Sequence, residues 1–131
     1  MKKRIYIAGK LNDMAIDYLY NVHKMMETAE KVRLAGYSVY IPAIDLIMGI
    51  KFGYKDYHDY FDNSQPWLAA SDAIVLVPGW ETSDGTKREM IRAKSLDIPI
   101  YKLNELAQMQ KDLLQVGSYH GGSAGPISKV K

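Results

Sequence analysis

Apolar residues follow two alternating patterns along the chain. Short runs rich in β-branched and aromatic residues predict strands at residues 4–8, 37–41, 72–77 and 99–103. Longer segments, with apolar residues every three or four positions, predict helices at about residues 14–34, 59–70, 84–96 and 105–115. The run from 72 to 77 is apolar after its first residue, which is typical of a central parallel strand buried on both faces.

Some of these segments carry more specific expectations. Asp13 is the expected N-cap of the first helix. The apolar positions of that helix recur at helical spacing, at Ile16, Leu19, Tyr20 and Met26. Two glycines interrupt residues 43–57, which predicts a loop with short helical pieces. In the helix that follows, we expect Trp67 and Leu68 to face inward.

The alternation of strands and helices predicts the fold class. A strand, a helix and a second strand in sequence imply parallel strands joined by a right-handed crossover. Repetition of this unit predicts a doubly wound α/β fold with three layers. Ligands of such folds bind beyond the carboxyl ends of the strands, which selects the loops at 9–13, 42–53 and 79–85. We expect one domain over residues 1–115 and a flexible, glycine-rich tail over residues 116–131.

Composition narrows the classes of function. The chain has 131 residues, no cysteine and a formal net charge of +2. Disulfides, thiolate catalysis and cysteine-based metal sites are therefore excluded. There is no basic stripe with interleaved aromatic residues, so we expect no nucleic-acid polymer as partner, whereas a small anionic ligand stays open. No apolar run approaches the roughly 20 residues of a membrane helix. The apolar stretch after the basic start is too short for export, so we expect a cytoplasmic protein without a membrane partner.

Several common site motifs are absent from the sequence. It contains no P-loop, no glycine fingerprint for a dinucleotide after the first strand, and no nucleophile elbow. Its three histidines, His23, His58 and His120, lack the spacing of metal ligands. We therefore expect no metal and no other cofactor.

Carboxylates are the remaining candidates for chemistry at the strand ends. Glu89 lies in the first two turns of the helix after the central strand, on a face shared with Ala93 and Leu96, which should pack on the sheet. An acid on an inward face is costly without partners, and the helix N-terminus favours its anion. Gly85 leaves room for a ligand to approach. Two interpretations fit: a surface helix acid, or a carboxylate beside an open pocket, as attack on an anomeric carbon requires.

Other polar residues near these loops have two interpretations each. Tyr6 is either a core tyrosine or a hydroxyl that holds the glutamate. Ser83 is either a helix cap or a phosphate ligand at the helix N-terminus. Lys10 is either solvated or paired with that phosphate. Asp62 and Asp84 are the acids near the expected pocket, and each is either solvated or catalytic.

Three stretches of the chain, in their order and spacing, resemble the nucleoside 2-deoxyribosyltransferase family. They are Tyr6-Ile7-Ala8-Gly9, Trp67-Leu68 followed by Ser71-Asp72-Ala73-Ile74-Val75, and Gly85-Thr86-Lys87-Arg88-Glu89. A further stretch, Val77-Pro78-Gly79-Trp80-Glu81, is most similar to small, often phage-encoded members. The resemblance covers residues 3 to 102.

The resemblance implies a fold, a reaction and an assembly. It implies a flavodoxin-like α/β fold with five parallel strands, no cofactor, and a homodimer or higher homo-oligomer that completes the site. Glu89 corresponds to the glutamate that attacks C1' of a 2'-deoxynucleoside, and Tyr6 to the tyrosine that orients it. Members that hydrolyse deoxynucleoside 5'-monophosphates have a phosphate-binding serine at the position of Ser83, which favours a nucleotide substrate. We expect the substrate to be bound by Gly9, Lys10, Ser83, Asp84 and Gly85.

Two departures from the family pattern bear on this chemistry. Where the family places an aspartate that protonates the leaving base, this chain has Ser64, and Asp62 can substitute only if the helix register shifts. The arginine that monophosphate hydrolases carry after the first strand is also missing. Asn12 is nearest to that position, and Lys10 is a possible replacement. The expected catalytic set is Glu89, Tyr6 and Asp62.

Three alternatives stay open at this point. Ser64 favours a non-catalytic nucleotide sensor of the same fold. A flavin-binding, flavodoxin-like protein fits less well, because residues 9–13 lack a hydroxyl-rich phosphate loop. An interaction protein would use Tyr54, Tyr57 and Tyr60, which share one face at helical spacing. Those tyrosines alternatively form a lid over the base or part of the core.

Overall fold

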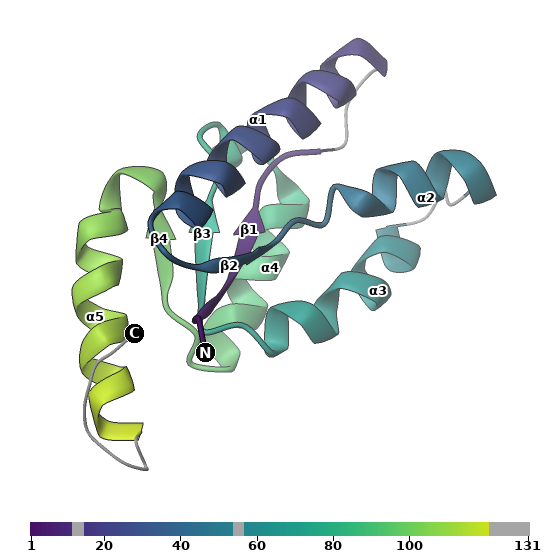
Figure 1. Cartoon of the computed structure of the whole chain (residues 1–131). Helices are drawn as coiled ribbons and strands as arrows, with labels where there is room; N and C mark the ends of the chain where they lie inside the picture. Colours follow the sequence, from purple (N-terminus) through teal and green to yellow (C-terminus); the bar gives the residue numbers. More distant parts are fainter. Residues whose placement is uncertain (12–14, 54–56, 121–131) are drawn as a thin grey trace.

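The computed structural model describes residues 1–11, 15–53 and 57–120, and strands and helices alternate along it (Figure 1). The strands are β1 (Arg4–Ala8), β2 (Ser38–Tyr40), β3 (Ala73–Leu76) and β4 (Ile100–Lys102). The helices are α1 (Ala15–Leu34), α2 (Ile44–Phe52), α3 (Tyr57–Ala69), α4 (Asp84–Ser95) and α5 (Leu106–His120). Two short 3-10 helices are η1 (Trp80–Thr82) and η2 (Leu103–Glu105). Within the described ranges, no helix combines the length and apolar character needed to cross a membrane.

The strands form a parallel sheet in the order β2-β1-β3-β4. These are the four strands that the apolar pattern predicts, and the described residues contain no fifth strand of the kind that the resemblance implies. In β1, Tyr6 pairs with Tyr40 on one side and with Ile74 on the other. The chain moves outward from β1 in both directions, so the switch point of the sheet lies between β1 and β3. A ligand is expected beyond the carboxyl ends of these two strands.

The side chains of β1 alternate between two apolar cores. Ile5 and Ile7 lie in a core with residues of α1 and α5. Tyr6 and Ala8 lie in a second core with residues of α3 and α4. Figure 1 accordingly shows α1 in front of the sheet and α4 behind it. The two cores confirm the three-layer α/β architecture, and strand alternation places Tyr6 on the side of α4, which carries Glu89.

The inward face of α1 differs from the predicted stripe. The predicted positions are all more than half exposed: Ile16, Leu19, Tyr20 and Met26. The residues of α1 that pack on the sheet are instead Met25, Ala29 and Val32. Figure 1 shows the first half of α1 extending past the sheet, and the exposed residues Ile16, Leu19 and Tyr20 belong to that half. The expected N-cap, Asp13, lies outside the described residues.

Within the segment predicted as a loop with short helical pieces, residues 44–52 form one continuous helix, α2. Gly49 does not break it. The hydroxyl of Tyr60 occupies the space that a side chain at Gly49 would fill, so the glycine serves packing between α2 and α3. The helix ends at Gly53, whose φ of 79° lies in the left-handed region that favours glycine. Tertiary contact therefore overrides the local glycine signal.

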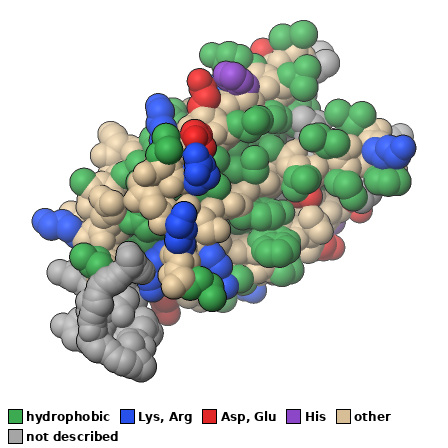
Figure 2. Space-filling model, in the orientation of Figure 1, with side chains coloured by type: hydrophobic (Ala, Val, Ile, Leu, Met, Phe, Trp, Pro, Cys, Tyr) green, Lys and Arg blue, Asp and Glu red, His purple; other side chains and the backbone are tan. Residues whose placement is uncertain are grey.

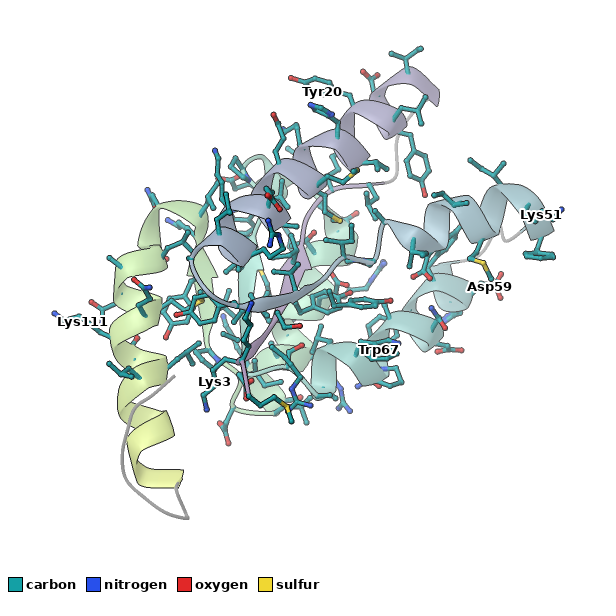
Figure 3. All side chains as sticks on the ribbon, viewed as in Figure 1. Lys3, Tyr20, Lys51, Asp59, Trp67 and Lys111 are labelled. Atoms are coloured by element: carbon teal, nitrogen blue, oxygen red, sulfur yellow. The ribbon has the colours of Figure 1, made fainter. Side chains whose placement is uncertain are left out.

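Two other predictions are corrected at the ends of helices. Leu68 is buried as expected, but Trp67 is 56% exposed and projects from α3 (Figure 3). One face of its ring stacks on Tyr40 of the edge strand β2, with 5.4 Å between ring centroids. At the end of the chain, α5 continues to His120, beyond the predicted start of the tail at residue 116. Residues 121–131 of the predicted tail lie outside the described residues.

Candidate active site at the carboxyl edge of the sheet

A cavity of about 640 Å³ lies at the carboxyl edge of the sheet. Its walls come from the loop after β1, the start of α2, the middle of α3 and the first turns of α4, with one residue of α1. The strand-end rule, that ligands of doubly wound folds bind beyond the carboxyl ends of the strands, selects the three loops that contribute to this cavity. A volume of this size lies within the range of about 300–1,000 Å³ typical of small-molecule sites.

Gly9 lines the cavity, and packing against the end of β3 leaves no room for a side chain at this position. A Cβ at Gly9 would lie 2.6 Å from Cβ and Cγ2 of Val77, closer than non-bonded carbons approach. The missing side chain therefore lets the chain leave β1 directly beside the end of β3. This close approach shapes the floor of the cavity at the switch point.

Glu89 lies in the wall of the cavity, and a tyrosine of the sheet holds its carboxyl group. The hydroxyl of Tyr6, which is fully buried, donates a hydrogen bond to Oε2 of Glu89. The hydroxyl of Ser64, buried on α3 and also lining the cavity, bonds in turn to Tyr6. Three elements thus fix one carboxyl group: β1, α3 and α4. The predicted contact between Tyr6 and Glu89 is present, and Ser64 supports it.

The surroundings of this carboxyl perturb its ionisation. Burial raises the pKa of Glu89 to about 7; the hydrogen bond from Tyr6 opposes this shift and the nearby charge of Asp45 adds to it. Burial, and then the Glu89 carboxyl, raise the pKa of Tyr6 well above its usual value. Tyr6 therefore remains a neutral hydrogen-bond donor while Glu89 titrates near neutral pH.

Asp45 is a second enclosed carboxyl in the cavity, and the sequence interpretation missed it. It lies in the first turn of α2 and is buried. Nδ2 of Asn63, on α3, donates to Oδ1 of Asp45 at 2.8 Å. Burial raises the pKa of Asp45, and the bond from Asn63 opposes the shift. Asp45 is the single acidic residue among residues 42–53, so the strand-end rule could have selected it from the sequence.

The N-terminus of α4 forms a different, anion-favouring side of the cavity. Ser83 is the N-cap, as one of its two interpretations predicts, and its Oγ accepts from the backbone N of Thr86 at 3.1 Å. Asp84 and Gly85 follow it along the cavity wall. The cations Lys10 and Arg88 also line the cavity, and each has an interaction partner in the protein. Helix N–H groups together with two cations on the wall of one cavity suit a phosphate.

Aromatic side chains form the side of the cavity toward α1 and α3. Tyr18, Tyr60 and Phe61 line this side. The hydroxyls of Tyr18 and Tyr60 are hydrogen-bonded to each other. Burial, Tyr60 and Asp45 raise the pKa of Tyr18 to about 12, so its ring stays neutral. Flat, neutral rings with polar edges suit a planar heteroaromatic ligand.

Not every predicted site residue reaches the cavity. Asp62 is exposed and does not line it. Ser64, two positions along α3, lines it instead, because residues two apart on a helix point to nearly opposite faces. Of the predicted tyrosine face, Tyr60 lines the cavity, whereas Tyr54 and the side chain of Tyr57 lie outside the described residues. No group of three or more His, Asp or Glu that could hold a metal occurs within residues 1–11, 15–53 and 57–120.

Comparison with known families gives one match. The family described as "Domain of unknown function (DUF4406)" matches residues 3–102. The match spans most of the chain, so the chain belongs to this family. It includes all four strands and every residue that lines the cavity. No curated protein matches the chain.

Proposed function

We propose that this member of the DUF4406 family breaks the N-glycosidic bond of a 2'-deoxynucleoside or its 5'-monophosphate, with Glu89 as nucleophile. The observation that carries the proposal is the chain of hydrogen bonds from Ser64 through Tyr6 to Glu89 on the cavity wall. Enclosing a carboxyl costs free energy that a purely structural role does not explain. The resemblance to nucleoside 2-deoxyribosyltransferases assigns the same roles to Glu89 and Tyr6.

The reaction is a two-step displacement that retains configuration. Tyr6 holds Oε2 of Glu89, so Oε1 is the atom that attacks C1' of the sugar. The base leaves with the electron pair of the C1'–N bond, and a glycosyl ester with Glu89 forms. Water or a second base then attacks C1' from the opposite face and releases the carboxylate. The absence of a 2'-hydroxyl makes the oxocarbenium-like transition state easier to reach.

A 5'-phosphate fits the N-terminal side of α4. Ser83, Gly85 and the first N–H groups of α4 lie on this side, and Lys10 and Arg88 supply positive charge. Lys10 then takes the place of the arginine that is missing after β1. The side formed by Tyr18, Tyr60 and Phe61 is aromatic instead of cationic, and it accommodates the base. The two sides together favour a nucleotide over a free nucleoside.

Self-association is part of the proposal. Large apolar side chains are exposed on α1 and α2: Ile16, Leu19, Tyr20, Ile44, Ile47, Ile50 and Phe52. Figure 2 shows hydrophobic side chains gathered over these two helices on the visible face. Apolar surface of this kind is typical of a protein interface. We propose a homodimer or higher homo-oligomer that buries it, and we expect Ile47→Lys to yield a smaller species than wild type by analytical ultracentrifugation.

A base-release assay tests the proposed reaction. Purified protein is incubated with each deoxynucleoside and each deoxynucleoside 5'-monophosphate, and the free base is measured by chromatography. Wild type should release base, and Glu89→Ala should lose at least about a thousandfold, as expected for a missing nucleophile. Glu27→Gln changes an exposed carboxyl on α1 and should behave as wild type. Equal rates for wild type and Glu89→Ala contradict the role of Glu89.

A nucleotide sensor is the second candidate function. Ser64 favours it, because this position carries the proton-donating aspartate in the family that the chain resembles. A sensor binds deoxynucleotides without consuming them. Tight binding in calorimetry together with no base release from any substrate would support the sensor over the enzyme.

A further inference from the structure

Cleavage of an N-glycosidic bond needs more than a nucleophile. The departing base carries the electron pair of the broken bond, and an ordinary base leaves slowly unless a proton reaches its ring. Three carboxyls line the cavity: Asp45, Asp84 and Glu89. Glu89 is the nucleophile of the proposed function. Asp84 is exposed to solvent at the N-terminus of α4, so the protein does not enclose it.

We infer that Asp45 is the general acid that protonates the leaving base, an inference that rests on the proposed function. Asp45 is buried, lines the cavity and approaches it from α2, an element different from the ones that hold Glu89. The amide of Asn63 donates to Oδ1 and fixes the side chain. Because Oδ1 accepts that bond, a proton on Asp45 belongs on Oδ2. The carboxyl that Ser64 lacks is thus supplied from a different helix.

The two carboxyls exchange bonds and protons in a balanced sequence. In the first step Glu89 Oε1 bonds to C1', the C1'–N bond breaks, and the proton on Asp45 Oδ2 moves to the base. The products are a neutral base, a glycosyl ester and the Asp45 carboxylate. In the second step water bonds to C1', the ester bond breaks, and a water proton returns to Asp45. The net change is hydrolysis, and both carboxyls return to their starting states.

Titratable and charged groups from several elements surround Asp45. Tyr18 from α1 and Tyr40 from β2 face it, and both have a pKa of about 12, so they are neutral. The charge of Asp45 raises the pKa of Glu89 on α4. Asn63 on α3 is uncharged, and the charged residues elsewhere on the cavity wall are Lys10, Asp84 and Arg88. The two carboxyls titrate as a pair, and the proposed step uses the singly protonated form that has its proton on Asp45.

A substrate that needs no proton isolates the role of Asp45. In 7-methyl-2'-deoxyguanosine 5'-monophosphate the base is already cationic, so it leaves as a neutral molecule without an acid. The experiment compares kcat/KM for this substrate and for 2'-deoxyguanosine 5'-monophosphate, because kcat/KM reports the steps through base release. Asp45→Asn should lose about 10²–10⁴-fold on the ordinary substrate and keep most of its activity on the methylated one. Glu89→Ala should lose activity on both.

Each outcome separates the inference from the proposed function. Equal losses on the two substrates by Asp45→Asn, with wild type active, overturn the role of Asp45 and leave the proposed function standing. Absence of base release by wild type from either substrate overturns both. Activity of Asp45→Asn on the methylated substrate also reports that the variant is folded.

A second variant tests the same role if Asp45→Asn fails to fold. Asn63 is exposed on α3, so Asn63→Leu should be tolerated. Its bond to Asp45 lowers the pKa of that carboxyl, so its loss raises the pKa. An acid must be protonated to act. The pH profile of kcat/KM should therefore move to higher pH in Asn63→Leu, while an unchanged profile counts against Asp45.

Discussion

Glu89 should make the stability of this protein fall as pH rises, whatever the protein catalyses. Its carboxyl has a folded pKa of about 7 against an ordinary value of 4.5. Between these two values the folded state holds a proton that the unfolded state has lost. Stability is therefore full below about pH 4.5 for this group and declines until about pH 7. Glu89→Gln removes the titration and keeps nearly the same shape.

The magnitude follows from the two pKa values. Their difference, at about 1.4 kcal/mol for each pH unit, amounts to about 3 kcal/mol. Asp45, whose pKa is also raised by burial, contributes in the same direction in both proteins. The difference between wild type and Glu89→Gln reports the Glu89 carboxyl together with its coupling to Asp45. We expect similar stabilities at pH 4.5 and a variant more stable than wild type by about 3 kcal/mol at pH 8.

Urea unfolding followed by circular dichroism measures this difference. Wild type, Glu89→Gln and the control Glu27→Gln are unfolded at several pH values between 4.5 and 8 at constant ionic strength. Glu27 is exposed on α1, so its replacement should leave the pH dependence of wild type unchanged. Parallel pH dependences for wild type and Glu89→Gln would refute the reasoning, because they would mean that the Glu89 carboxyl is as well solvated in the folded state as in the unfolded state.

Three further changes have expected outcomes. Tyr6→Phe removes the hydrogen bond that lowers the pKa of Glu89, so the pH profile of base release should move to higher pH; a profile identical to that of wild type contradicts this. Gly9→Ala should cost about 1–3 kcal/mol in urea unfolding, and Val77→Ala should not rescue it, since the Cβ of Val77 is itself 2.6 Å from the new one. Lys10→Ala should raise KM for deoxynucleoside 5'-monophosphates and leave KM for free deoxynucleosides unchanged, whereas equal effects on both classes argue against a phosphate contact.

Local pattern determined the sheet and the helix that carries Glu89. Short runs rich in β-branched and aromatic residues, bounded by turn residues, predict all four strands. The continuous apolar run at 73–77 predicts the central one, because a central parallel strand is buried on both faces. Ser83 is a short polar residue before a helical stretch and caps α4 as such residues do. The strand-end rule then selects the cavity loops, whereas from the residues alone the contact of Tyr6 with Glu89 is one of two interpretations.

Only the tertiary structure decided which polar groups share the cavity. Asp45 and Asn63 are 18 residues apart and meet because α2 packs beside α3, a contact that no local spacing encodes. The choice of Ser64 over Asp62 depends on the rotation of α3 about its axis, which is set by the burial of the whole helix. The exposed stripe on α1 likewise depends on where the sheet ends. Periodicity reports which residues lie on the same face, whereas the partner of that face is a property of the packed chain.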